Sequence, residues 1–532
     1  MARRFLTILA TIIVAVLVFA ACGNAPTDPQ PPAQQQQQPE QQDNQQEQPE
    51  TDAPTGATAR THLNIVSSNL ATSMFPAGRN DQPSSQINTQ IFNTLVTLDY
   101  DTFEVLPSLA LSWDFVDPQT INMELRQGVT FHNGASLTAQ DVQWSIDSAI
   151  ANPEFALIFG MVENVEIHDD YNITVHLNIP FSPILRHLAH PAGGIVPYGT
   201  TREQHDEHPI GTGPFMFDSI TIGDRLELVR FDDFWGELPV IESLTWRIIP
   251  TSDGRLLAVE TGEADIALAL MPPDVGPAEM FGNVNLMRRM NLSNDYIGFN
   301  TQMAPFDDPL VRRALNYAVD TETIVNVVLG GVGAPSQGFI NDIVFGWAPT
   351  DPFDFNPDRA RELLAEAGFP DGFPARLWTN SENQRRIDIS TIVAAQLRDV
   401  GVDVTFETFE FATMTSRLDA GEHDMFLLGW VCVGGDADYG LFPLFHSANH
   451  GAPGNRSFYT NPEVDRLLEE GRAATSDADR LRIYAELQEI LRDDAPWLLL
   501  NQNETLMAVS TDLRGLRLNP SDSHLYSGVW FE

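Results

Sequence analysis

Residues 106–147 read LPSLALSWDFVDPQTINMELRQGVTFHNGASLTAQDVQWSID, and this stretch holds three local signals of a mixed α/β fold. Residues 121–125 alternate apolar and polar side chains, which predicts a half-buried strand. Asn133-Gly134 is typical of a tight turn. Thr138 predicts the start of a helix, because its side chain can cap the first turn and Asp141 lies at the favourable end of the helix dipole.

Strands and helices interleave on both sides of this stretch. Strand patterns are found at residues 62–66, 226–230, 245–249 and 265–268. Helical patterns are found at residues 85–95, 309–319, 358–367, 386–400 and 477–491. No fixed-period repeat is present, so the pattern predicts a mixed α/β architecture. A chain of 532 residues is long enough for two to four domains.

The N-terminal residues read MARRFLTILATIIVAVLVFAACGN. Two arginines, an apolar run and Ala20-Ala21 precede Cys22, which predicts a signal peptide over residues 1–21. An uncleaved membrane anchor is the alternative, but the run is shorter than the ~20 residues of a span. Residues 22–59 are rich in glutamine and proline and are expected to form a disordered tether. The folded part therefore begins near Arg60.

The charge of the chain excludes several partners. Its net charge is −43, and all of its 30 basic residues are arginine. Such an acidic chain is not expected to bind nucleic acid or to be attracted to an anionic membrane surface. Of its two cysteines, Cys432 is expected to be a packed free thiol. The sequence has no metal-ligand spacing and no catalytic motif, so we predict no metal, no cofactor and no enzymatic activity.

Several segments together resemble a known family. The pattern P-x-L-A-x-S-W, L-R-x-G-V-x-F-H-x-G and T-A-x-D-V within residues 106–147 is similar to the signature of family 5 extracellular solute-binding proteins, the peptide- and nickel-binding receptors of bacterial ABC importers. Further matches are GTGPF at 211–215, YIGFN at 296–300, VRRALNYA at 311–318 and the segment 428–439. Phe19-Ala-Ala-Cys22 resembles the lipobox of bacterial lipoproteins, which implies lipidation of Cys22.

The resemblance implies a two-lobed periplasmic-binding-protein type II fold with an extra subdomain in the first lobe. Lobe one would comprise residues 60–98, 210–298 and 496–532, and the extra subdomain residues 99–209. Lobe two would comprise residues 299–495. Ligand would be enclosed between the lobes as they close about a hinge.

The resemblance also implies a ligand pocket around Trp430. In peptide-binding relatives, an aspartate three residues after this tryptophan holds the ligand's amine, whereas this chain has Val433 there. The nearby acids Asp436 and Asp438 are therefore predicted to take over that role, because a buried ammonium needs a carboxylate partner. Both could instead cap a following helix. Trp430 and Tyr439 are predicted to pack on the ligand, in a segment that looks like that of glutathione-binding members.

Further ligand contacts are predicted on both lobes. By alignment with peptide-binding relatives, the segment before the helix at Ser85 borders the cleft, and its candidates are Arg79, Asn80, Asp81 and Gln82. Arg79 could hold a ligand carboxylate. The candidates on lobe two are Asn380, Asn383, Arg385 and Arg386.

The expected function is capture of peptides or glutathione-like solutes outside the membrane by a monomeric lipoprotein. The expected partners are the solute, an ABC permease with its ATPases, and the outer face of the cell membrane, reached through Cys22, or else a periplasmic location. Binding of a nickel chelate or a sugar, and a role as sensor or chaperone without transport, are the alternatives.

Overall fold

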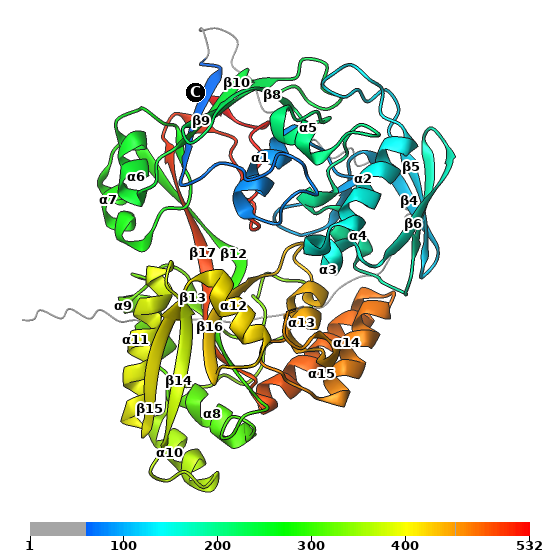
Figure 1. Cartoon of the computed structure of the whole chain (residues 1–532). Coiled ribbons are helices and arrows are strands. Elements are labelled where there is room, and N and C mark those ends of the chain that lie inside the picture. Colours follow the sequence, from blue (N-terminus) through cyan, green and yellow to red (C-terminus); the bar gives the residue numbers. More distant parts are fainter. Residues whose placement is uncertain (1–59, 453) are drawn as a thin grey trace, which may run out of the picture. The chain divides into compact units, whose positions relative to one another are not determined.

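The computed structural model describes residues 60–452 and 454–532 (Figure 1). The signal peptide, Cys22 and the tether, predicted for residues 1–59, lie outside these ranges. Within them, no helix is both long and apolar enough to cross a membrane.

The largest sheet among the described residues has eleven strands and runs through both halves of the fold. Its central strands are β12 (Val284–Phe299) and β17 (Trp497–Ser510), which pair antiparallel over most of their length. On one side lie β16 (Met425–Val431), β14 (Phe373–Asn380) and β15 (Val402–Phe409). On the other side lie β11 (Ile266–Ala267), β1 (His62–Ser67), β10 (Ser243–Ile248), β9 (Arg225–Arg230) and β8 (Phe215–Thr221), while β13 (Ala334–Pro335) pairs with β17 off this path.

The two central strands join two lobes (Figure 1). The register of the β12–β17 pair shifts between Met290 and Asn294 and again between Asp295 and Tyr296. Separate hydrophobic clusters lie on the two sides of these shifts, around β1 and β10 on one side and around β14 and β16 on the other. Such bulges bend a strand pair. The two-lobed type II fold predicted from the sequence is confirmed.

A second, four-stranded sheet lies beside the first lobe, in the order β4-β5-β7-β6. Its strands are β4 (Ala110–Asp117), β5 (Thr120–Leu125), β7 (Asn172–Leu177) and β6 (Val162–Asp169). Two small two-stranded sheets pair β2 (Val96–Leu98) with β3 (Val105–Pro107) and β18 (Leu513–Arg514) with β19 (Trp530–Phe531). That residues 99–209 form a subdomain of their own stays a prediction.

Seven helices of the described chain precede the end of β12. They are α1 (Gln82–Ile91), α2 (Ala139–Ala151), α3 (Ala156–Phe159), α4 (Ile184–Leu188), α5 (Arg202–Glu207), α6 (Ser252–Glu260) and α7 (Val275–Met280). Helix α1 begins three residues before the predicted Ser85 and ends at Ile91, because Asp81 caps it and Pro83 fits its first turn. This start places residues 80–82 at a helix N-terminus.

The helices that follow β12 belong to the second lobe. They are α8 (Pro309–Tyr317), α9 (Thr321–Val327), α10 (Pro357–Glu366), α11 (Gln384–Asp399), α12 (Phe411–Asp419), α13 (Ala437–Phe445), α14 (Pro462–Ala473) and α15 (Asp477–Asp494). The predicted helices at 309, 358, 386 and 477 are thus present with small shifts at their ends. Local caps explain this agreement, since each cap is encoded next to the helix that it begins.

Candidate functional site

A cavity of about 270 Å3 lies between the two lobes. Its walls come from the N-terminus of α1, from the end of β16 with the loop that follows, and from the C-terminal segment. The lining residues are Asn80, Asp81, Gln82, Ser85, His190, Pro191, Gly429, Trp430, Val431, Val433, Tyr439, Ser521 and Ser523. A neighbouring cavity of about 140 Å3 shares His190, Pro191, Val433, Ser521 and Ser523 with it.

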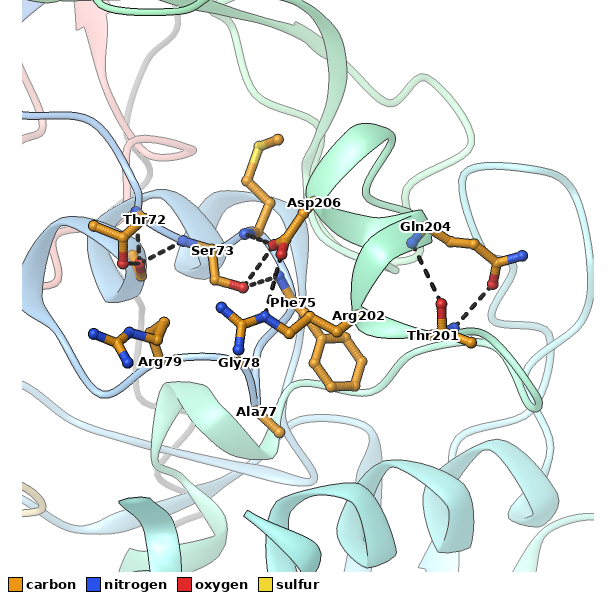
Figure 2. A network of polar contacts seen from close by, with 12 residues as sticks. Thr72, Ser73, Phe75, Ala77, Gly78, Arg79, Thr201, Arg202, Gln204 and Asp206 are labelled. Atoms are coloured by element: carbon orange, nitrogen blue, oxygen red, sulfur yellow. Dashed lines mark hydrogen bonds and ion pairs between the residues drawn. The ribbon is translucent and has the colours of Figure 1, made fainter. Parts of the chain in front are cut away.

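The loop that leads into α1 is fixed to α5 by one carboxylate, as Figure 2 shows. The Asp206 carboxylate accepts hydrogen bonds from the Ser73 hydroxyl at 2.6 Å and from the backbone N–H of Met74 at 2.9 Å. Arg202, one turn earlier in α5, pairs with the other oxygen of Asp206 at 3.2 Å. The first-lobe wall of the cavity is therefore held by contacts distant in sequence.

Asp81 and Gln82 form the part of this wall nearest to the C-terminal segment. Asp81 caps α1, since its carboxylate accepts from the backbone N–H of Ser84 at 2.9 Å and from the Thr72 hydroxyl. The Gln82 side chain donates to the carbonyl oxygen of Ser521 at 3.0 Å. These bonds orient two of the predicted ligand contacts toward the cavity.

Arg79 is turned away from the cavity, toward Glu154. Its guanidinium lies 2.8 Å from the Glu154 carboxylate, whose other oxygen accepts from the backbone N–H of Asn80 at 3.0 Å. Both side chains of the pair are about half exposed. Three residues of the predicted segment line the cavity, namely Asn80, Asp81 and Gln82. Arg79 does not line it and stabilises the segment through its ion pair with Glu154.

Trp430 and Tyr439 form the aromatic wall of the second lobe. The Trp430 indole donates to the carbonyl oxygen of Tyr439 at 3.0 Å, and the two rings lie 5.4 Å apart. Tyr439 is buried, which raises the pKa of its phenol above the usual value. Both predicted aromatic contacts line the cavity, and both are uncharged.

The structure gives Asp436 and Asp438 partners within the protein. Asp436 lies 2.6 Å from Arg480 and 3.4 Å from Arg186, and Asp438 lies 3.0 Å from Arg472. Burial opposes ionisation of Asp436, but Arg480 holds the pKa of its carboxyl below the usual value. Asp436 also caps α13. Neither carboxylate lines either of the two cavities. The positively charged partner that we predicted to be a ligand ammonium is in each case an arginine of the protein.

A further charged group lies next to Gly429, which lines the cavity. Asp295 is fully buried in β12 and lies 2.8 Å from both Arg385 and Arg386. Burial raises the pKa of Asp295, but the two arginines outweigh this and lower it. A Cβ atom on Gly429, which lines the cavity, would lie within 2.6 Å of Asp295 and Arg386, so this pair abuts the cavity wall. Asn383 caps α11 and positions the two arginines.

Sequence reasoning missed Asp295 and the arginines of α14 and α15, Arg472 and Arg480. The available signal for Asp295 was an acid directly before the segment YIGFN at 296–300, which matches the family pattern. Arg472 and Arg480 lie 34 and 44 residues after their partners, on the faces of helices, and no local pattern indicates such pairs. Within the described ranges, no cluster of three or more histidine, cysteine or acidic side chains is placed to hold a metal ion.

Comparison with known proteins gives the same assignment. The model of the "Bacterial extracellular solute-binding proteins, family 5 Middle" matches residues 104–452. The glutathione-binding protein GsiB of Pectobacterium atrosepticum is 30% identical over 464 residues, which cover 84% of this chain and 90% of that protein.

Solved structures agree with this match. HbpA2 from Haemophilus parasuis is similar, with a TM-score of 0.80 and 28% identity, over 88% of this chain and 100% of that one. DppA from Helicobacter pylori, an ABC transporter-associated periplasmic binding protein solved with the peptide STSA, has a TM-score of 0.76 and 27% identity, over 88% of this chain and 98% of that one. By its fold, its interlobe cavity and these matches, the chain belongs to the family 5 bacterial extracellular solute-binding proteins.

Proposed function

We propose that this protein is the substrate-binding lipoprotein of an ABC importer and captures short peptides or glutathione-like solutes outside the membrane. The observation that carries the proposal is the interlobe cavity, because both lobes supply its walls and a bound solute would hold them together. Relatives named for glutathione binding, and a similar structure that holds the peptide STSA, support the substrate class.

The size and lining of the cavity favour a small, polar solute. A volume of about 270 Å3 is below the ~300–1,000 Å3 typical of sites for drug-sized ligands. In the proposed complex, Trp430 and Tyr439 pack on the body of the solute, and Asn80, Asp81 and Gln82 hydrogen-bond its polar groups. Arg385 receives a carboxylate of the solute. The residues that stabilise these contacts without touching the solute are Arg79, Asn383, Asp436 and Asp438.

Binding is tested by calorimetry on the purified folded part with glutathione, dipeptides, tripeptides, nickel–histidine and a disaccharide. We expect binding of at least one peptide-like probe, a higher melting temperature in its presence and a smaller radius of gyration in solution scattering. Binding of only the nickel chelate, or of only the sugar, would show that the proposed substrate class is wrong. Conversion of a bound peptide into products would contradict a receptor without chemistry.

Membrane attachment through Cys22 and delivery to a permease are the other parts of the proposal. A cysteine that carries two or more acyl chains would hold the protein firmly at the membrane. Cells that express the protein with an alkyne-labelled fatty acid should label the wild type and not Cys22→Ala, which should leave the membrane fraction. Equal labelling of both proteins would exclude this anchor. Deletion of the genes for the proposed permease should abolish uptake of the solute without affecting its binding.

A further inference from the structure

A third and larger cavity, here called the outer cavity, has a volume of about 860 Å3. Its walls come from β4 of the four-stranded sheet, from α4 and from the junction of α14 and α15. Its aromatic lining residues are Trp113, Phe115, Phe181 and Phe345, and its acidic ones are Glu104, Asp117 and Asp477. Such a lining can accept an aromatic group, and it favours one that lies close to a positive charge.

Arg186 of α4 lies between the outer cavity and the cavity of about 140 Å3 beside the solute site. Among the lining residues within the described ranges, Arg186 alone is common to these two cavities. The chain next to it is divided in the same way, since Phe103 lines the smaller cavity while Thr102 and Glu104 line the outer one. The wall between the cavities at this point therefore consists of Arg186 and the backbone around Phe103.

Three contacts hold the Arg186 side chain in this wall. Its guanidinium donates to the carbonyl oxygen of Phe103 at 2.6 Å, lies 3.4 Å from the carboxylate of Asp436, and lies 5.2 Å from the centre of the Phe345 ring. The side chain is only 15% exposed. Hydrogen bonds of a charged group are costly to break in a partly buried place, so a solute would not displace this side chain easily.

We propose that Arg186 limits the length of the captured solute, because its side chain closes the passage from the solute site to the outer cavity. The inference rests on the proposed function and adds a length limit to it. The cavities of about 270 and 140 Å3 share lining residues, so one solute can occupy both. A longer solute would have to continue through the wall at Arg186.

Two substitutions separate the volume of the Arg186 side chain from its charge. Arg186→Met removes the charge and keeps a long, unbranched side chain, so the wall remains. Arg186→Ala removes the same charge and opens the wall. Both leave Asp436 with Arg480, which donates to it at 2.6 and 2.9 Å, so both should fold. Arg186→Ser is a second short variant for the case that the alanine variant does not fold.

Calorimetry measures the binding of alanine peptides of three to six residues that carry one phenylalanine at either the N-terminus or the C-terminus. For the wild type and for Arg186→Met, we expect the dissociation constant to rise at least about tenfold from the shortest to the longest peptide. Arg186→Ala should bind at least one of the long peptides about tenfold more tightly than Arg186→Met does, because the phenylalanine is then buried in the outer cavity. Peptides with phenylalanine at the N-terminus should gain most, since their ammonium would lie near the acids of that cavity.

Phe115 shows whether the longer peptide reaches the outer cavity. Phe115→Ala should remove most of the gain in the Arg186→Ala background, because it removes part of the aromatic lining. In the wild-type background it should leave binding of the three-residue peptides unchanged, since Phe115 lines neither of the two smaller cavities. Its side chain is 40% exposed, so the substitution should not prevent folding. A gain that survives Phe115→Ala would refute the proposed path.

The remaining outcomes separate the length limit from the function. If the wild type binds short and long peptides equally, the length limit is wrong and the receptor function remains. Equal length preferences of Arg186→Ala and Arg186→Met would likewise show that the Arg186 side chain is not the barrier. If no peptide of any length binds the wild type, the peptide class of the proposed function fails and the length limit with it.

Discussion

Asp436 is compensated by two arginines that belong to different lobes. Arg480 comes from α15 of the second lobe, and Arg186 comes from α4 beside the four-stranded sheet. The carboxylate and the Arg480 side chain are almost completely buried. At the scale of single residues, this charge therefore stabilises the contact between the lobes.

Removal of the Asp436 charge should destabilise the protein strongly. Asp436→Asn leaves two guanidinium groups without their buried partner, which typically costs about 3–5 kcal/mol. The matched control is Asp358→Asn, since Asp358 pairs with Arg361 on the surface of α10 and is 92% exposed. That change should cost less than about 1 kcal/mol. Urea unfolding measures both, and equal costs would show that Asp436 does not act as a buried partner.

Cys432 should be chemically inert in the folded protein. Its thiol is 3% exposed and donates to the carbonyl oxygen of Asp436 at 3.0 Å, and burial raises its pKa well above the usual value. Only the thiolate reacts with alkylating reagents. Iodoacetamide at pH 8 should leave the Cys432 peptide unmodified in buffer and modify it fully in urea, as read by mass spectrometry. Rapid labelling in buffer would contradict this burial.

Residue types could be predicted better than residue partners. The sequence indicated that Trp430 and Tyr439 belong together, because they lie in one short segment. It also drew attention to Asp436 and Asp438, but Arg480 and Arg472 follow them 44 and 34 residues later and could not be paired with them in advance.

At the scale of elements, the helix caps behave as local signals. The Asp141 carboxylate accepts from the backbone N–H of Thr138 at 2.7 Å, from the Thr138 hydroxyl at 2.9 Å and from the backbone N–H of Tyr198 at 2.8 Å. The first two bonds were predictable from spacing. The third, which ties the start of α2 to a distant loop, was not.

Loss of the Asp141 carboxylate should therefore cost more than a simple cap. Asp141→Ala leaves two part-buried backbone N–H groups, those of Thr138 and Tyr198, without their acceptor, which we expect to cost about 2 kcal/mol in the free energy of unfolding. Asp477→Ala, an exposed acid in the first turn of α15, is the control and should cost at most about 1 kcal/mol. The urea midpoints of the two variants decide this. A cost for Asp141→Ala no greater than the control would mean that water replaces the carboxylate.

The long strands β12 and β17 escaped prediction for a physical reason. Asn291, Asn294 and Asp295 interrupt the apolar alternation of β12, which lowers its resemblance to a strand. Polar side chains are tolerated here because they find partners elsewhere in the chain: the Asn294 amide donates to the carbonyl oxygen of Phe339, and Asp295 accepts from Arg386. The element that joins the lobes was thus the least predictable one, and it also carries the buried Asp295.

At the scale of the whole molecule, the net charge of −43 acts against the compact state. Salt screens this repulsion, but it also weakens exposed ion pairs, each worth about 0–1 kcal/mol. With 73 acidic against 30 basic residues, the repulsion should dominate. The melting temperature should therefore rise between about 0.05 and 1 M NaCl. Sucrose, which does not screen charge, is the comparison. A melting temperature that falls as NaCl is added would show that the ion pairs dominate.

Acidification should unfold the protein before most of its carboxylates titrate, because buried histidines are kept neutral. Burial lowers the pKa to about 3 or 4 at His132, His190, His205, His423 and His524. Their pKa in the unfolded chain is about 6.5, so between pH 6.5 and 4 the unfolded state binds protons that the folded state does not. Stability is therefore fully present above pH 6.5 and is lost as the pH falls.

The size of this effect makes it measurable. At pH 5 each such histidine costs up to about 2 kcal/mol, and five together approach the whole stability of a typical domain. Asp522 works in the opposite sense, since its raised pKa favours the folded state as the pH falls through about 6, but it is one group against five. Urea unfolding at pH 7.5, 6.5, 5.5 and 5 should show a falling midpoint, with a smaller slope in His205→Gln. A constant midpoint over this range would mean that these histidines become protonated inside the folded protein.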